Sequence, residues 1–441
     1  MRPRTGEKCG GLKSTHPIPQ FAPGPARGPY PKAPPRPSVA TPSRFTANPL
    51  DRPDEQPRAV ESLSAGELIA LRTLLADLGQ AARRYRFEVA PNPCVGACVL
   101  SSGVEIGRGF HLEFGGPHAE VQALRAAAKS GVPRERWDTL VCTLEPCSTE
   151  GKTPACRDAI AEAGLRRCIV GELDPDIRHR GLGLKALRER AVEVTLLSGA
   201  SPLGQVSPHF LSWTRPERLR RKRPWTIAKW AQTRTGQLRP PSDLGEGRWI
   251  SGPSSLAEVH QLRARVDAIV TGRGTVLADD PRLTVRLPAF TADPPIRVVM
   301  DALLRTSPGA RLFENPGEGE AGGAVHIIAR AGVDPRRARE LHRVGATIHT
   351  VRSGDDGQPS LREVQGLLWA LGVRRVLVEA GPTLLTSCFR AEFVDQVRVY
   401  TGAINGGEGG GLAEWLAPER LLEAEHAEVG VDARLDAFVR S

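Results

Sequence analysis

Gly116-Pro117-His118-Ala119-Glu120 and the later stretch Glu145-Pro146-Cys147-Ser148-Thr149-Glu150-Gly151-Lys152-Thr153-Pro154-Ala155-Cys156 decide the fold and chemistry of the first half of this chain. One imidazole and two thiolates are three of the four ligands of a tetrahedral zinc ion, so a water molecule can occupy the fourth position, as in catalytic sites. Glu120 is placed to move a proton between that water and a leaving amine. We predict that His118, Cys147 and Cys156 bind Zn2+ and that Glu120 is catalytic.

These residue types form the signature of zinc-dependent base deaminases, although eight residues separate the two cysteines here instead of the usual two. Taken alone, a histidine at a helix start is more often a cap or a core residue than a metal ligand. A purely structural zinc site would also need a fourth protein ligand. The complete set of ligands, together with the glutamate, favours a catalytic site.

Composition and charge limit the classes of protein to which the chain can belong. Its 441 residues are 40% hydrophobic and long enough for two domains, and no apolar run approaches the ~18 residues of a membrane span. The net charge is +10, but residues 1–59 hold ten Lys/Arg against four Asp/Glu, so the remainder is nearly balanced. The charge argument for a nucleic-acid partner is therefore weak. We expect neither a membrane nor a nucleic-acid partner.

Cysteine usage indicates a reducing compartment. Eight cysteines are too few for a disulfide scaffold in a chain of this length, and the N-terminus has no apolar signal-peptide core. We therefore expect a cytoplasmic protein, in which paired cysteines more often bind metal. The cysteines outside the zinc motif are predicted to be inert; they are Cys9, Cys94, Cys98, Cys142, Cys168 and Cys388.

Residues 1–62 are predicted to form a disordered basic extension. Fourteen prolines and few branched aliphatic residues precede Val60, so this segment cannot bury enough apolar surface to fold. We also hypothesise that residues before Val60 are absent from the mature protein.

Residues 63–212 are predicted to form one α/β domain. Leucines at three- and four-residue spacing indicate an amphipathic helix from Ser64 to Gly79. Strands are predicted at residues 97–100, 104–109, 138–144, 168–171 and 192–197. Helices are predicted at 155–164, at 184–190 and from Pro117, which suits a first helical turn. Cys156 would then lie at the positive end of a helix, so we expect a lowered thiol pKa.

The first half of the sequence resembles the deaminase half of the bifunctional riboflavin-biosynthesis deaminase–reductase family. The resemblance rests on Pro91-Asn92-Pro93-x-Val95-Gly96, His111, Pro117 to Val121, Leu144 to Ser148 and Gly151-Lys152-Thr153-Pro154-x-Cys156. It implies a zinc cytidine-deaminase-like three-layer domain. It also implies that substrate contacts Asn92, His111, Lys152 and Asp174. Lys152 is chemically apt because a phosphorylated sugar needs a cation.

Two positions depart from the pattern of this family. The family's Cys-Ser-His is Cys147-Ser148-Thr149 here, which removes an imidazole from the pocket. Its Asp-Pro-Asn-Pro is Asp174-Pro175-Asp176-Ile177, and the additional acid could repel a phosphate. Both changes affect substrate binding and leave the metal chemistry intact.

Residues 224–441 are predicted to form a second α/β domain after a basic linker at 213–223. A solvated face is more plausible for the linker than a nucleic-acid patch, because no aromatic residues interleave it. Strands are predicted at residues 225–230, 268–271, 296–300, 325–329, 347–351 and 376–379. Helices are predicted at 335–344, 361–371, 383–391 and 253–265, the last capped by Ser251. The alternation indicates a mainly parallel sheet with helices on both faces.

A phosphate cradle is predicted at Val378-Glu379-Ala380-Gly381-Pro382-Thr383. A strand end there delivers a glycine to a helix whose free N–H groups attract an anion, although a simple strand-to-helix turn gives the same pattern. Gly272-x-Gly274 is a weaker dinucleotide signal, because Leu277 occupies the third glycine position.

Several motifs of the second half resemble the reductase domain of the same family, a dihydrofolate-reductase-like fold that uses NADPH. They are Trp249-Ile250, Arg263, residues 274–286, residues 295–298, residues 378–383 and Gly406-Gly407. The resemblance implies NADPH binding by Trp249, Thr275, Asp279 and Gly381 to Ser387, including Pro382 and Thr383. It implies substrate binding by Lys229, Arg263, Leu283, Arg286 and Glu379, the two arginines suiting a phosphate. The family's Ser-Leu-Asp-Gly is Thr233-Arg234-Thr235-Gly236, so an acid is missing.

The resemblance implies two successive reactions on a small phosphoribosyl-pyrimidine. The first half would deaminate a diamino-pyrimidinone, and the second would reduce its ribosyl group to ribityl with NADPH. We also expect a homo-oligomer. Two alternatives stay open: only one activity is retained, as Thr149, Asp176 and Thr235 suggest, or the chain is a nucleic-acid base deaminase with an accessory domain.

Overall fold

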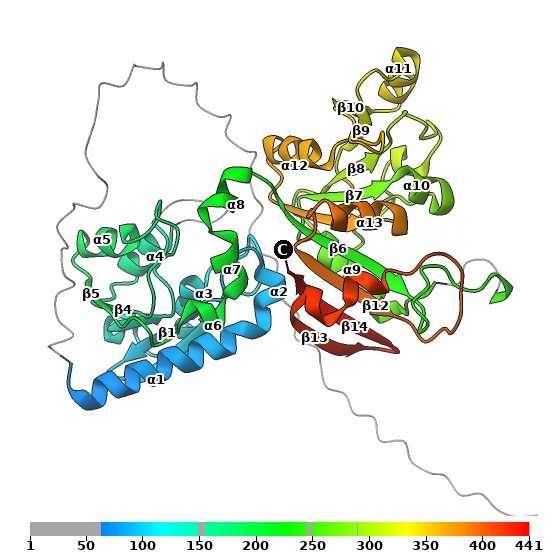
Figure 1. The fold of residues 1–441 in the computed structure, drawn as a ribbon. Coiled ribbons are helices and arrows are strands. Elements are labelled where there is room, and N and C mark those ends of the chain that lie inside the picture. Colours follow the sequence, from blue (N-terminus) through cyan, green and yellow to red (C-terminus); the bar gives the residue numbers. More distant parts are fainter. Residues whose placement is uncertain (1–62, 149–154, 245–248, 289, 441) are drawn as a thin grey trace, which may run out of the picture. The chain divides into compact units, whose positions relative to one another are not determined.

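The computed structural model describes residues 63–148, 155–244, 249–288 and 290–440 (Figure 1). The predicted extension at residues 1–62, including the Val60 hypothesis, lies outside the described residues, as do Thr149 and Lys152. All described residues belong to one compact unit, Pro49–Ser441.

Two β-sheets with their helices follow one another along the chain. The first half contains α1 Ala65–Ala82, α2 Arg86–Val89, β1 Gly96–Ser101, β2 Val104–Phe110, α3 Ala119–Ala127, β3 Thr139–Cys142, α4 Cys156–Glu162, β4 Arg167–Val170, α5 Leu182–Arg188, β5 Glu193–Leu196, α6 Leu203–Val206, α7 Pro208–Trp213 and α8 Pro216–Arg221. The second half contains β6 Trp225–Gln232, α9 Pro253–Arg263, β7 Ala268–Gly272, α10 Arg273–Asp279, β8 Ile296–Met300, β9 Val325–Arg330, α11 Pro335–Arg343, β10 Ala346–Val351, α12 Leu361–Ala370, β11 Arg375–Glu379, α13 Pro382–Arg390, β12 Gln396–Thr401, β13 Leu421–Val429 and β14 Asp432–Val439.

The first sheet is the middle layer of a three-layer sandwich. Its strand order is β2-β1-β3-β4-β5, antiparallel from β2 to β3 and parallel from β3 to β5. Successive residues of a strand face opposite sides of a sheet. Accordingly, Cys98 shares a core with Leu75 of α1, whereas Ala97 and Val99 share another core with Ala123 of α3. The expected three-layer fold and its five strands are confirmed.

The predicted end of the first helix and the predicted N-cap of α9 were wrong. α1 continues past Gly79 to Ala82. A Cβ at Gly79 would lie 2.1 Å from Ser201 Oγ, so this glycine permits close packing and does not stop the helix. At the start of α9, Gly252 occupies the N-cap position that we predicted for Ser251.

Helix α3 packs with its backbone directly against strand β2. A Cβ at Gly109 would lie 2.2 Å from the Ala123 nitrogen, and one at Gly107 would lie 2.3 Å from the Ala127 nitrogen. Only glycine allows such an approach between two backbones. Because His118 is the N-cap of α3, this contact sets the position of a predicted metal ligand.

The second sheet has nine strands in the order β10-β9-β8-β7-β11-β6-β12-β14-β13. The strands from β10 to β12 run parallel, and β14 runs antiparallel to both of its neighbours. Val376 and Val378 of β11 share a core with Leu368 of α12, whereas Leu377 shares the opposite core with Leu262 of α9. The predicted parallel sheet with helices on both faces is confirmed (Figure 1).

Four elements of the second half were missed by the sequence analysis: α10, β12, β13 and β14. Strand β13 has a sequence rich in glutamate and alanine and mostly exposed residues, which is more typical of a helix than of a strand. It lies at the edge of the sheet and, among the strands that the structure describes, pairs with β14 alone. Pairing with a neighbour, which local sequence does not encode, fixes its conformation.

The predicted basic linker at 213–223 is partly helical and is not uniformly solvated. The side chain of Arg223 is only 4% exposed and donates hydrogen bonds to both carboxylate oxygens of Asp395, at 2.8 and 2.5 Å. Arg218 of α8 lies 3.6 Å from the same carboxylate. Because Asp395 directly precedes the unpredicted strand β12, this partner could not be anticipated from the sequence.

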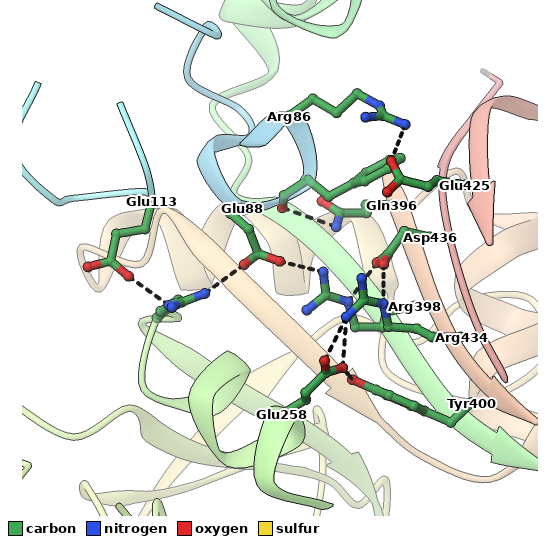
Figure 2. Close-up of polar contacts among 12 residues, drawn as sticks. Arg86, Glu88, Glu113, Glu258, Gln396, Arg398, Tyr400, Glu425, Arg434 and Asp436 are labelled. Carbon is green, nitrogen blue, oxygen red and sulfur yellow. Dashed lines mark hydrogen bonds and ion pairs between the residues drawn. The ribbon is translucent and has the colours of Figure 1, made fainter. Parts of the chain in front are cut away.

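A buried charge cluster joins α2 to the second sheet (Figure 2). Glu88 accepts hydrogen bonds from Arg265 at 2.8 Å and from Arg398 of β12 at 2.6 Å. Arg398 also pairs with Asp436 of β14 at 2.6 Å. Burial alone would raise the pKa of Glu88, but Arg398, Arg375 and Arg265 outweigh it and lower that pKa to about 2.

Replacing Gly109 with alanine should push α3 away from β2, since the added Cβ meets backbone atoms that cannot rotate aside. We expect a loss of about 1–3 kcal/mol in the free energy of unfolding, measured by urea denaturation. Gly66→Ala in α1 is the matched control, because a Cβ there meets nothing within 4 Å. Equal stability of Gly109→Ala and wild type would contradict the packing argument.

Replacing Glu88 with glutamine should lower stability at neutral pH by about 1–3 kcal/mol, because a buried guanidinium loses its carboxylate. The folded-state pKa of Glu88 lies below its ordinary value of 4.5. Its contribution is therefore present above about pH 4.5 and is lost as the pH falls towards 2. Melting temperatures of wild type and variant should converge over that range. Glu135→Gln, an exposed carboxylate, is the control and should show no such convergence.

Candidate functional sites

His118, Cys147 and Cys156 converge in the first half of the chain. His118 caps α3, Cys147 follows the loop after β3, and Cys156 is the first residue of α4. His118 Nδ1 lies 3.2 Å from Cys156 Sγ and 3.6 Å from Cys147 Sγ. Two ligands of a tetrahedral zinc are separated by about 3.5 Å, given metal–ligand bonds of about 2.0–2.3 Å. The three side chains could therefore hold a zinc ion.

The two thiols of this centre differ in their pKa values. Hydrogen bonds from Cys156 and His118 outweigh burial and lower the pKa of Cys147 to about 4. The pKa of Cys156 is raised, first by its pairing with Cys147 and then by burial. Our expectation of a lowered pKa for Cys156 was wrong, because its pairing with Cys147 and its burial raise the pKa. The N–H at the start of α4 donates instead to Cys147 Sγ, at 3.2 Å, and lowers the pKa of that thiol.

Glu120 lies in the first turn of α3 and lines the same cavity as His118 and Cys147. Only 3% of its surface is exposed. Burial raises the pKa of its carboxyl group, while the neighbouring His118 opposes the shift. A carboxyl group with a raised pKa is suited to accept a proton and then return it near neutral pH.

The first cavity has a volume of about 360 Å³. Two predicted substrate residues, Asn92 and His111, line it together with the predicted metal ligands His118 and Cys147. Burial and the nearby His118 lower the pKa of His111 to about 4, so the ring is neutral at pH 7. Its Nδ1–H donates to the Pro117 carbonyl at 3.2 Å, which leaves Nε2 to accept from the Asn92 amide at 3.3 Å. Pro117 precedes His118, the N-cap of α3, so our prediction that Pro117 lies in the first helical turn was wrong.

Residues that sequence reasoning missed hold the loop of Asn92 in place. His209 of α7 lies with Nε2 2.9 Å from the Asn92 carbonyl oxygen. Ser207 accepts a hydrogen bond from the Cys94 N–H at 2.8 Å. A single histidine outside any motif carries no signal for this role, so only the folded chain reveals it.

Glu145 fixes the loop that carries the predicted substrate residue Asp174. Its buried carboxylate accepts hydrogen bonds from the N–H groups of Asp174 at 3.1 Å, Gly181 at 2.9 Å and Gly183 at 2.8 Å. A Cβ at Gly183 would lie 2.0 Å from the Pro146 carbonyl oxygen, so the loop packs directly on the zinc motif. Burial raises the pKa of Asp174, which lines the cavity.

A second cavity of about 1290 Å³ lies in the second half of the chain. It contains the predicted cofactor residues Trp249, Thr275, Asp279, Gly381, Pro382 and Thr383 and the predicted substrate residues Lys229, Arg263, Leu283, Arg286 and Glu379. Several of them follow the carboxyl ends of adjacent parallel strands, which is where ligands bind in open α/β sheets.

Glu379, the last residue of β11, is the centre of charge in this cavity. Arg263 donates to both of its carboxylate oxygens, at 2.6 and 3.0 Å, and Lys229 Nζ lies at 3.9 Å. Burial would raise the pKa of Glu379, but Arg263 and Lys229 lower it to about 2. Burial lowers the pKa of Lys229, against the attraction of Glu379. The carboxylate is therefore charged and oriented.

The two arginines predicted to bind phosphate differ in availability. Arg263 is committed to Glu379 and to the Thr284 carbonyl, which accepts from Nη1 at 2.8 Å. Arg286 is half exposed and pairs with Glu320 at 2.9 Å. Leu283, which lies between the two arginines in sequence, adopts a φ of 53°. This left-handed conformation costs a non-glycine residue about 1–2 kcal/mol. Backbone strain of this kind is concentrated at ligand sites.

The predicted phosphate cradle has the expected geometry. Strand β11 ends at Glu379, Gly381 is the N-cap, and α13 begins at Pro382. A Cβ at Gly381 would meet only Thr275 Oγ1, at 4.0 Å, so a ligand can approach the backbone closely. The Gly381 N–H donates to the same hydroxyl group at 3.2 Å, which joins the cradle to α10. The exposed Trp249 and Asp279, whose pKa burial raises, complete the predicted cofactor residues.

Thr235, where the family has an acid, is absent from the residues that line the second cavity. Its hydroxyl donates to the Gly406 carbonyl at 3.2 Å. At the adjoining Gly407, with a φ of 125°, a Cβ would lie 2.3 Å from the Arg239 carbonyl oxygen. The threonine therefore links two loops beside the cavity, and the missing acid does not change the described cavity wall directly.

The remaining cysteines in the described part of the chain are free and buried: Cys94, Cys98, Cys142, Cys168 and Cys388. Burial raises the pKa of Cys94, Cys98 and Cys388 to about 12. Thiols with such values are unreactive, as predicted; Cys9 lies outside the described residues.

The fold and these two sites define a zinc-dependent deaminase joined to a nicotinamide-dependent reductase. The family described as the cytidine and deoxycytidylate deaminase zinc-binding region matches residues 72–172. The RibD C-terminal domain family matches residues 224–431.

The chain belongs to the RibD family of bifunctional riboflavin-biosynthesis enzymes. It is 33% identical over 356 residues to riboflavin biosynthesis protein RibD of Escherichia coli (strain K12). The matched stretch covers 78% of this chain and 90% of that protein. The structure of Acinetobacter baumannii RibD matches with a TM-score of 0.57 and 26% identity, over 85% of this chain and 100% of that one. A diaminohydroxyphosphoribosylaminopyrimidine deaminase/5-amino-6-(5-phosphoribosylamino)uracil reductase from Thermotoga maritima matches with a TM-score of 0.54 and 26% identity, over 85% of this chain and 99% of that one.

Replacing Cys147 with serine should lower the affinity for zinc by on the order of tenfold or more, because a thiolate ligand is lost. The zinc content of the purified protein, measured by mass spectrometry of the metal, should fall accordingly. Cys388→Ser, at a buried free thiol of α13, should retain wild-type zinc. Full zinc content in Cys147→Ser would refute the ligand assignment.

Proposed function

We propose that the chain converts 2,5-diamino-6-(5-phosphoribosylamino)pyrimidin-4-one in two steps. Residues 63–212 deaminate the ring hydrolytically, and residues 224–441 then reduce the ribosyl group to ribityl with NADPH. The observation that carries this proposal is that one chain holds both the His118–Cys147–Cys156 centre beside Glu120 and a separate cavity built around Glu379.

In the first cavity, His118, Cys147 and Cys156 would hold a zinc ion, which would supply Lewis-acid activation of water. Glu120 takes a proton from the attacking water, whose oxygen bonds to the amino-bearing ring carbon, and returns it to the amine, which leaves as ammonia when its C–N bond breaks. The neutral His111 and the Asn92 amide, already hydrogen-bonded to each other, bind the pyrimidine through their remaining polar groups. The fixed Asn92 loop keeps the reacting carbon opposite Glu120 without reorganisation at each turnover.

In the second cavity, NADPH supplies the hydride. The N–H groups at the start of α13 and the Thr275 hydroxyl would hold the cofactor's phosphates, and the exposed Trp249 would offer an aromatic face. Lys229, oriented by Glu379, supplies a proton donor beside the sugar. Arg286 faces the substrate phosphate, since Arg263 is engaged in holding Glu379.

The proposed setting is a cytoplasmic homo-oligomer with neither nucleic-acid nor membrane partners. Five unpaired buried thiols in the described residues support a reducing compartment. The described part of the chain contains no helix that is both long and apolar enough to span a bilayer. The alternative that only one activity is retained receives less support, because Thr235 does not line the described cavity.

Two reciprocal substitutions test the proposal. Glu120→Gln should lower the rate of ammonia release at least ~100-fold by removing the proton carrier and leave bound zinc and NADPH oxidation on deaminated substrate unchanged. Lys229→Met should show the opposite: ammonia release continues and NADPH oxidation falls.

Ammonia release and NADPH oxidation are assayed separately with each purified variant. Wild-type protein that releases ammonia but never oxidises NADPH would leave only a deaminase. Ammonia release by Glu120→Gln at the wild-type rate would show that another group carries the proton.

A further inference from the structure

Asp176 and Arg178 form an ion pair at the wall of the first cavity. Arg178 Nε lies 2.9 and 3.0 Å from the two carboxylate oxygens of Asp176, and Nη2 also donates to Oδ2. The side chain of Asp176 is 6% exposed, whereas that of Arg178 is 61% exposed. The acid is therefore covered, and the guanidinium is presented to solvent at the cavity.

The backbone around this pair is held by local hydrogen bonds. The Asp176 N–H donates to Asp174 Oδ1 at 2.8 Å, and the Arg178 N–H donates to Asp176 Oδ1 at 3.0 Å. The Asp176 carbonyl accepts from the N–H groups of His179 and Arg180, both at 2.9 Å. A side chain that starts from such a fixed turn loses little further entropy when it binds a ligand.

Carboxyl groups predominate among the charged side chains that line the described wall of the first cavity, so an anionic ligand needs a cationic side chain there. Four carboxyl groups of the described residues line it, those of Glu120, Glu145, Asp174 and Asp176. Among the described residues that line it, Arg178 is the only arginine or lysine. On the described wall, Arg178 is therefore the permanently charged hydrogen-bond donor available to a phosphate in this cavity.

The guanidinium retains free donors after pairing with Asp176. It has five N–H groups, and its bonds to Asp176 use Nε and one hydrogen of Nη2. The remaining hydrogens, including both on Nη1, can donate to phosphate oxygens, a geometry that guanidinium and phosphate groups favour. Asp176 meanwhile has its charge compensated, consistent with the lowered pKa that Arg178 gives it.

We propose that Arg178 binds the substrate phosphate in the first cavity and that Asp176 is the positioning residue that holds it there. This inference rests on the proposed deamination of a phosphoribosyl substrate. On this reading, the aspartate in place of the family's asparagine does not repel the phosphate, because it is engaged with Arg178. The specificity of the deaminase for a phosphorylated substrate then depends on a residue that the sequence motifs did not single out.

The test compares ammonia release from the phosphorylated substrate and from the same compound without its phosphate. Arg178→Ala should raise KM for the phosphorylated compound by about tenfold, the effect of losing a charged hydrogen bond, with kcat and zinc content unchanged. KM for the dephosphorylated compound should not move. Arg178→Lys should recover part of the loss. Arg180→Ala is the matched control, an exposed arginine of the same loop that does not line the cavity.

Equal changes in KM for both compounds, or no change for either, would overturn the role of Arg178. A wild-type protein that releases no ammonia from either compound would instead overturn the proposed deamination. The two failures are thus distinguishable in one set of assays.

Discussion

The contact between the backbones of α3 and β2 is the constraint on which the first site depends. Gly107 and Gly109 let the helix lie against the strand at a distance that any Cβ would prevent. The helix N-terminus is thereby fixed at the sheet, and with it His118 as its cap and Glu120 in its first turn. Cys147 and Cys156 arrive from the next strand and helix. A metal centre of three ligands from three elements is only as well positioned as those elements are.

Buried or half-buried guanidinium–carboxylate pairs recur in the described part of the chain. Asp395, Glu88 and Glu379 are each paired with buried or half-buried arginines. Such pairs add little net stability compared with apolar packing, but breaking one of them leaves a buried charge alone. In the described part of the chain, several arginines are thus engaged in pairs inside the fold.

The two sites share a plan in which side chains follow the carboxyl ends of parallel strands. In the first sheet, Cys147 and Asp174 follow β3 and β4; in the second, Lys229 and Glu379 lie in and at the end of β6 and β11. Loops at this edge of a sheet vary without disturbing the core, which allows two chemistries on similar frameworks. The first cavity has a volume of about 360 Å³ and carries several carboxyl groups, whereas the second has a volume of about 1290 Å³ and contains the predicted cofactor and substrate residues of the second half.

The sequence by itself predicted the three candidate zinc ligands that the fold brings together, the order of most strands and helices, and the glycine at the start of α13. These features follow from residue types at fixed spacing, which local chemistry constrains directly. Only the tertiary structure decided the purpose of Gly79, the pairing of Arg223 with Asp395 and the conformation of β13. It also decided which thiol has the lowered pKa and where Arg178 lies. Gly79 contacts Ser201 and Arg223 contacts Asp395, and both partners are distant in sequence, so the spacing of residues carries no record of them. The other three features depend on strand pairing, on the direction of a hydrogen bond and on the shape of the cavity, which arise only in the folded chain.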